Sequence, residues 1–165
     1  MTHRANNHHE DVNAVCYSRS NSNLVFSGGD DGIVTCWDSR LFGNNDSPVG
    51  YLAGHREGIT YIDTKSDGYT VLTNSKDQTI KIWDIRKFSD EQEAHRYQNQ
   101  ISDNRYDYRY ELPDHQPIIR RAQGNGIQFI NIFTIIIGDT SVLTLSGAKV
   151  TQTLIRARFS PDYTG

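Results

Sequence analysis

Residues 26–38 read FSGGDDGIVTCWD, and residues 72–84 read LTNSKDQTIKIWD. Both stretches hold an aspartate in the middle and end on a Trp-Asp pair, and an arginine follows two residues later in each. The offset between the two stretches is 46 residues. Self-similarity with a period of about 20–50 residues is the signature of a repeat architecture. The sequence therefore predicts two consecutive copies of one supersecondary unit.

Short β-branched and apolar runs, separated by turn residues, predict that each copy is made of strands. In the first copy the expected strands are residues 12–17, 24–27, 33–37 and 49–53, and in the second copy they are 59–63, 70–74 and 80–83. The turns between the second and third strands are GGDDG at residues 28–32 and KDQ at residues 76–78. Glycine and aspartate tolerate the positive φ angles of tight hairpins, so the expected fold class is all-β.

Four polar side chains recur in each copy at matching positions. A histidine stands four residues before the first strand, a Ser or Thr stands four residues before the turn aspartate, and a tryptophan follows that aspartate by six. This pattern resembles the structural tetrad of the WD-repeat family. The resemblance implies two hydrogen-bonded networks: His8, Ser27, Asp31 and Trp37 in one, and His55, Thr73, Asp77 and Trp83 in the other. A buried aspartate needs surrounding donors, and imidazole, hydroxyl and indole groups supply them.

The resemblance implies a WD-repeat β-propeller fragment with two blades and the start of a third. One four-stranded blade cannot bury its own faces, so blades must stack in a ring. The expected divisions are a disordered N-terminus at 1–7, blades at 8–53 and 54–89, a polar excursion at 90–123, an anomalous apolar insert at 124–138 and a truncated next blade at 139–165.

The last two divisions depart from the repeat. Residues 124–138 (GNGIQFINIFTIIIG) carry no charge and no proline, which is typical of an aggregation-prone segment, and they match no blade position. Residues 154–159 (LIRARF) are expected to form the first strand of the next blade. Gly147-Ala148 stands where the family pattern has Gly-His, so we expect the third tetrad to be incomplete.

Composition narrows the function classes. The net charge of −3 argues against a dominant role in nucleic-acid binding, and no apolar run reaches the length of a membrane span. The start of the sequence has no apolar core of a signal peptide. Cys16 and Cys36 are expected to be reduced packing residues. No cofactor is expected.

Two chemical alternatives can be read from the same residues. His3, His8 and His9 are close in sequence, but zinc sites usually need three or four spaced ligands, so no metal site is expected. Ser27, Asp31 and His8 have the residue types of a hydrolase triad. The set recurs in the second copy, which a catalytic site would not do, so no catalytic residue is expected.

The arginines two residues beyond each Trp-Asp pair are the candidate binding residues. The Trp-Asp-x-Arg pattern resembles WD-repeat substrate receptors of cullin-4 RING ubiquitin ligases, and NSKDQTIK at residues 74–81 is a specific part of that likeness. The resemblance implies that Arg40 and Arg86 dock on the damaged-DNA-binding adaptor of the ligase, helped by Asp38 and Asp84. The alternative is that each arginine is a solvated side chain or pairs locally with Asp38 or Asp84. The planar guanidinium suits that task because it makes paired bonds to carboxylates or carbonyls.

The expected function is thus protein binding: a receptor that presents protein substrates for ubiquitination and proteasomal degradation, located in the cytoplasm and nucleus. Two alternatives remain, a general WD-repeat scaffold without a ligase and a fragment with no function of its own. In the scaffold alternative, Arg40 and Arg86 can be replaced without loss of partners.

Overall fold

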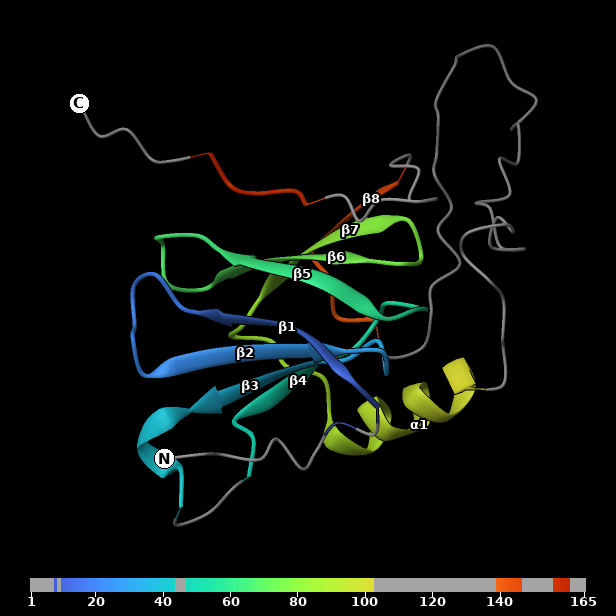
Figure 1. Cartoon of the computed structure of the whole chain (residues 1–165), viewed down its shortest axis with the longest axis horizontal. Coiled ribbons are helices and arrows are strands. Elements are labelled where there is room, and N and C mark those ends of the chain that lie inside the picture. Colours follow the sequence, from blue (N-terminus) through green and yellow to red (C-terminus); the bar gives the residue numbers. More distant parts are fainter. Residues whose placement is uncertain (1–7, 9, 44–46, 103–138, 147–155, 161–165) are drawn as a thin grey trace.

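A computed structural model describes residues 8, 10–43, 47–102, 139–146 and 156–160. It contains two four-stranded antiparallel sheets, in which the strands follow one another in chain order (Figure 1). The first sheet comprises β1 (Val12–Tyr17), β2 (Leu24–Gly29), β3 (Val34–Asp38) and β4 (Gly50–Leu52). The second comprises β5 (Ile59–Thr64), β6 (Thr70–Ser75), β7 (Thr79–Asp84) and β8 (Leu143–Ser146). The expected all-β fold is therefore confirmed.

The sequence predicts that the second blade ends at residue 89, but the second sheet takes its fourth strand from beyond that residue. β8 pairs with β7 in the register Thr79↔Ser146 to Ile82↔Leu143. It thus completes the second sheet, although residues 139–165 were assigned to the next blade. The open edge of β7 needs a partner for its backbone groups. No local pattern in the sequence indicates that partner, because residues 85–142 separate β7 from β8.

The predicted strand at residues 154–159 is described only from residue 156 onward, and residues 156–159 form no regular strand. They nevertheless lie against the second sheet. The Ala157 backbone N–H donates to Asn74 Oδ1 at 3.0 Å, and the Phe159 N–H donates to Asp63 Oδ2 at 2.8 Å. The predictions for residues 1–7, 124–138 and 147–148 lie outside the described residues.

The connection after β7 returns to the first sheet. Its helix α1 (Glu91–Ser102) falls in the expected polar excursion. Ala94 of α1 is buried with Ile33, Tyr51 and Ala53 of the first blade. Ser89, just before the helix, forms an isolated antiparallel bridge with Tyr51 of β4. The connection thereby covers the outer edge of the first sheet.

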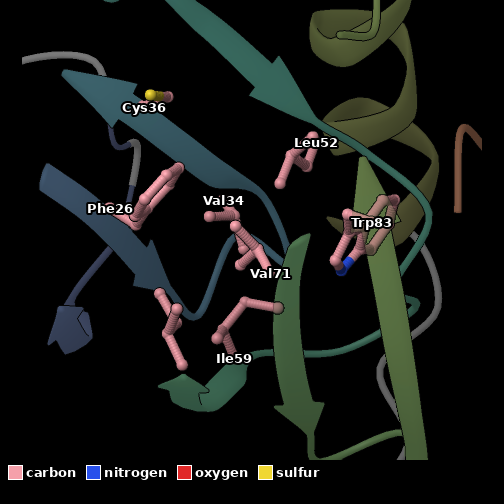
Figure 2. Packing of buried hydrophobic residues seen from close by; sticks show 8 residues of the cluster. Phe26, Val34, Cys36, Leu52, Ile59, Val71 and Trp83 are labelled. Carbon is pink, nitrogen blue, oxygen red and sulfur yellow. The ribbon is translucent and has the colours of Figure 1, made fainter. Parts of the chain in front are cut away.

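The main hydrophobic core lies between the two sheets, which meet through β1, β2 and β5 (Figures 1 and 2). Its buried members are Phe26, Val34, Cys36, Leu52, Ile59, Ile62, Val71 and Trp83. Gly28 leaves room for Ile59, since a Cβ at Gly28 would lie 2.6 Å from Ile59 Cγ2. Both cysteines are free, as expected, and burial raises the pKa of Cys36 to about 12. Among the described residues, no helix is long and apolar enough to span a bilayer.

Candidate interaction rim and the two tetrads

The tetrad of the first blade is assembled from the loop before β1 and from β2, the β2–β3 turn and β3. His8 Nδ1 lies 2.8 Å from Asp31 Oδ2, and His8 Nε2 lies 2.8 Å from Ser27 Oγ. The Trp37 indole N–H donates to the same Ser27 hydroxyl oxygen at 2.7 Å. Indole only donates and carboxylate only accepts. A proton on His8 Nδ1 therefore completes a chain of hydrogen bonds from the Trp37 indole, through the Ser27 hydroxyl and the imidazole, to the Asp31 carboxylate.

The second blade repeats the relay with threonine in place of serine. His55 Nδ1 lies 3.0 Å from Asp77 Oδ2, and His55 Nε2 lies 2.6 Å from Thr73 Oγ1. The Trp83 indole N–H donates to Thr73 Oγ1 at 2.7 Å. The structure thus brings together, in both blades, all the residues that the sequence placed in the tetrads.

Asp77 shows how the buried charge is tolerated. Burial by itself would raise the pKa of Asp77, but the charge and hydrogen bond of His55 oppose this. The Thr79 hydroxyl and the Arg56 backbone N–H also donate to Asp77, at 2.6 and 2.9 Å. Together these interactions lower the pKa of Asp77 to about 2. The aspartate is held as an anion and fixes the loop before β5 to the β6–β7 turn.

Each tetrad therefore joins neighbouring strands of its blade through buried hydrogen bonds. Ser27 and Thr73 are buried at 4% and 0% exposure. Each hydroxyl is already held by an indole and an imidazole, so its hydrogen bonds are made within the blade. Across the part of the chain that the structure describes, no cluster of three or more His, Cys, Asp or Glu residues could hold a metal ion.

The candidate binding residues lie where β3 and β7 end. Asp38 pairs with Leu24 at the start of β2, and Asp84 pairs with Thr70 at the start of β6. Both aspartates therefore lie at the same ends of the strands in their two sheets. We call Asp38, Arg40, Asp84 and Arg86 the arginine rim. Its residues sit where the third strand leaves each sheet, away from the tetrad aspartates in the turns at the opposite ends of the strands.

Each rim arginine is folded back on the aspartate two residues before it. Asp38 Oδ1 accepts the Arg40 backbone N–H at 3.0 Å, and both carboxylate oxygens accept from Arg40 Nε and Nη2 at 2.5–3.1 Å. The same bonds join Arg86 to Asp84 at 2.6–3.1 Å. The Asp-x-Arg spacing produces this geometry, since the aspartate caps the turn that directs the arginine side chain backwards.

The electrostatics of the rim favour fixed, exposed cations. The side-chain hydrogen bond from Arg40 lowers the pKa of Asp38 to about 2, and that from Arg86 does the same for Asp84. The arginine side chains remain 67% and 66% exposed. Only Nε and one N–H of Nη2 face the aspartate, so three of the five guanidinium N–H groups point elsewhere. The rim can therefore bind carboxylate or carbonyl oxygens of a partner.

Sequence reasoning missed two side chains that belong to these arrangements. Tyr69 places its ring under Arg86, with 4.2 Å between the guanidinium carbon and the ring centroid. Lys81 is 4% exposed, and its ammonium donates to Asp139 Oδ2 at 2.6 Å and to Thr144 Oγ1 at 2.8 Å. The register of the repeat could have singled out Tyr69, because it stands immediately before β6. Nothing in the sequence pairs Lys81 with Asp139.

Comparison with known proteins defines the class. The WD40 model, described as WD domain, G-beta repeat, matches residues 2–38 and 46–84. The chain thus carries two WD40 repeats, and its two sheets are consecutive blades of β-propeller type. The Cps50 (Swd1) β-propeller domain of Myceliophteria thermophila is a solved structure similar to this chain, with 23% identity and a TM-score of 0.43, over 49% of this chain and 23% of that one.

Within this class, residues 74–81 and the flanking segments resemble in particular WD-repeat protein 23, also called cullin-4-associated factor 11. Relatives with that name confirm the resemblance. The chain is 44% identical to the DDB1- and CUL4-associated factor 11 homolog of Caenorhabditis briggsae and 42% identical to that of Caenorhabditis elegans. Each alignment covers 97% of this chain and 26% of the relative. The LEC14B protein of Lithospermum erythrorhizon is 38% identical over 97% of this chain and 30% of its own length. The chain spans between a quarter and a third of these relatives.

Proposed function

We propose that this chain is part of a substrate receptor of a cullin-4 RING ubiquitin ligase, and that its arginine rim docks on the damaged-DNA-binding adaptor. The receptor would link target proteins to the ligase for ubiquitination and proteasomal degradation. It would work by binding, without chemistry of its own, in the cytoplasm and nucleus.

The single observation that carries the proposal is the duplicated rim. Two blades present the same exposed guanidinium, each held on its aspartate by the same set of bonds. One such arginine would be an ordinary surface residue, and an isolated exposed ion pair contributes little to stability. Two oriented cations at the same strand ends of adjacent blades suit a protein partner with matching oxygen acceptors. The names of the nematode relatives supply the kind of partner, a DDB1- and cullin-4-associated assembly.

The test is an affinity purification of the protein, tagged at its chromosomal locus so that it keeps its natural length. We compare wild type with an Arg40→Ala, Arg86→Ala double variant and identify the co-purifying proteins by mass spectrometry. The matched control is Arg56→Ala, because Arg56 lies beside the tetrad aspartate Asp77, at the opposite ends of the strands.

We expect the adaptor to accompany wild type and Arg56→Ala and to be lost from a double variant that remains folded by circular dichroism. Retention of the adaptor by the double variant would contradict the docking role of the arginines. Absence of the adaptor from wild type would leave the general WD-repeat scaffold as the better description.

A further inference from the structure

The two rim arginines are not equivalent in their surroundings. Arg86 is held along one edge by the Asp84 carboxylate and on one face by the Tyr69 ring, 4.2 Å from its guanidinium carbon. Arg40 has the carboxylate of Asp38, but among the described residues no aromatic ring faces it. Tyr69 is itself 41% exposed. Among the described rim residues, an aromatic ring therefore lies beside the arginine in the second blade and not in the first.

The β5–β6 turn fixes the position of Tyr69. Asp67 Oδ1 accepts the backbone N–H groups of Tyr69 and Thr70 at 3.1 and 2.9 Å. Gly68 adopts φ +89°, which a residue with a Cβ rarely adopts. A Cβ at Gly68 would also lie 2.9 Å from Ser20 Oγ of the neighbouring blade. The ring is thus presented by a tight turn, which limits the freedom that Tyr69 loses when a partner binds.

The first blade offers a matched position without the ring. The Ile85 N–H donates to the Tyr69 carbonyl at 3.0 Å, and the Ser39 N–H donates to the Asn23 carbonyl at 2.8 Å. Tyr69 immediately precedes β6 and Asn23 immediately precedes β2, the second strands of their blades. Asn23 is therefore the structural counterpart of Tyr69, and the two blades provide an internal control for the effect of the ring.

We propose that Tyr69 positions Arg86 and is a third contact of the docking surface, so that the second blade contributes more to adaptor binding than the first. The inference rests on the proposed function. A guanidinium fixed on one edge and one face keeps Nη1 and the second N–H of Nη2 for the partner. Fixing it before binding reduces the ordering cost. Tyrosine and arginine are also among the side chains that are enriched at energetic hot spots.

The partner's chemistry follows from this arrangement. It must present carboxylate or carbonyl oxygens to Arg86 and apolar surface beside them to cover the exposed part of the Tyr69 ring. At Arg40 the oxygens alone suffice. Such a partner surface is asymmetric along the rim, which fixes the direction in which the two proteins dock.

The experiment measures the affinity of purified adaptor for the natural-length protein and its variants. We expect Tyr69→Asn to weaken binding about 2–5-fold, the range of an exposed cation–π contact. Tyr69→Phe keeps the ring and should stay within about 2-fold of wild type. Asn23→Tyr should recover part of the loss in the Tyr69→Asn background. Arg86→Ala should weaken binding more than Arg40→Ala.

A second measurement reports on positioning without the adaptor. Phenylglyoxal modifies accessible guanidinium groups, and mass spectrometry gives the rate at each arginine, with Arg40 as the internal reference. We expect Tyr69→Asn to raise the rate at Arg86 relative to Arg40, and Tyr69→Phe to leave it unchanged. An unchanged rate in Tyr69→Asn overturns the positioning role.

The binding outcomes separate the two proposals. If wild type binds and Tyr69→Asn binds equally well, the inference fails while the proposed function stands. If wild type itself does not bind the adaptor, the proposed function fails and the docking role of Tyr69 fails with it.

Discussion

The first and second blades share one tetrad but close their sheets in different ways. In the first blade, β4 follows β3 after a short connection, and the Val49 N–H already donates to the Cys36 carbonyl at 2.8 Å. In the second, β8 arrives only after residues 85–142, and the buried Lys81 ammonium binds Asp139, Ser141 and Thr144 from the incoming segment. Thr35 occupies the Lys81 position in the first blade, fully buried. The short connection in the first blade brings β4 directly beside β3. In the second blade, the bonds from Lys81 hold the segment that carries β8 after the long connection.

The long connection also links the two blades. Phe88 packs on Gly50, where a Cβ would lie 2.3 Å from the ring. Ser89 Oγ accepts the Ala53 N–H at 3.1 Å and lies 3.0 Å from Thr140 Oγ1, just before β8. The segment that completes the second sheet thus also supports the outer edge of the first.

The tetrads, which the blades share, should give the largest effect. Asp77→Ala removes the acceptor of His55 and Arg56 inside the protein, and we expect it to lower the free energy of unfolding by about 3–5 kcal/mol. Urea unfolding followed by circular dichroism measures the change. Glu93→Ala, on the exposed side of α1, is the control and should stay within about 0.5 kcal/mol of wild type. A loss below about 1 kcal/mol for Asp77→Ala would contradict the role of the tetrad.

The same aspartate predicts a pH dependence. Its pKa is about 2 in the folded protein and about 3.9 in an unfolded chain. A lowered carboxyl pKa contributes stability above the unfolded value, and that contribution is lost as the pH falls from about 4 to about 2. Urea midpoints measured between about pH 6 and 2 should therefore fall less steeply for Asp77→Asn than for wild type. If the urea midpoints of wild type and Asp77→Asn fall equally with decreasing pH, the Asp77 carboxylate does not titrate as described.

The anchor of β8 should give the next largest effect, confined to the second blade. Lys81→Ala leaves Asp139 without its cation, and we expect a loss of about 3 kcal/mol. Hydrogen exchange should show faster opening of β8 amides, with β4 amides nearly unchanged. Lys81→Met fills a similar volume and should lose less. Equal acceleration in β4 and β8 would show that the pair stabilises both blades alike.

The contact between Phe88 and Gly50 tests whether the connection supports the first blade. Gly50→Ala forces the Phe88 ring away, and we expect it to lower the free energy of unfolding by about 2 kcal/mol. The β4 amides should exchange faster while the β6 amides stay protected. Unchanged protection of β4 would mean that the ring moves aside without loosening the edge.

The smallest expected effect lies at Thr35, the counterpart of Lys81. Within the described structure its buried hydroxyl has no hydrogen-bond partner. Thr35→Val removes that unsatisfied group at nearly constant volume, so we expect an unchanged protein or a gain of up to about 1 kcal/mol. Urea unfolding measures it. A loss of more than about 1 kcal/mol would reveal a partner for the hydroxyl.

The arrangement within each repeat could be read from the sequence because its signals are local. The Trp-Asp pairs, the turns and the histidine spacing match the WD-repeat pattern, and that resemblance placed every tetrad residue. The Asp-x-Arg spacing explains why Arg40 and Arg86 fold back on their aspartates. Tyr69 could have been found by the same register, although its ring contact with Arg86 depends on the conformation of the Asp67–Gly68 turn.

The sequence by itself determined two copies of a four-residue network and an all-β fold, since hydrogen-bonding needs and strand periodicity act over a few residues. Only the tertiary structure decided that β8 completes the second sheet, that Lys81 meets Asp139, and that α1 packs on the first blade. These contacts join segments separated by long connections. β8 pairs with the strand edge that β7 leaves open, and Asp139 pairs with the buried charge of Lys81. No local sequence pattern indicates either pairing.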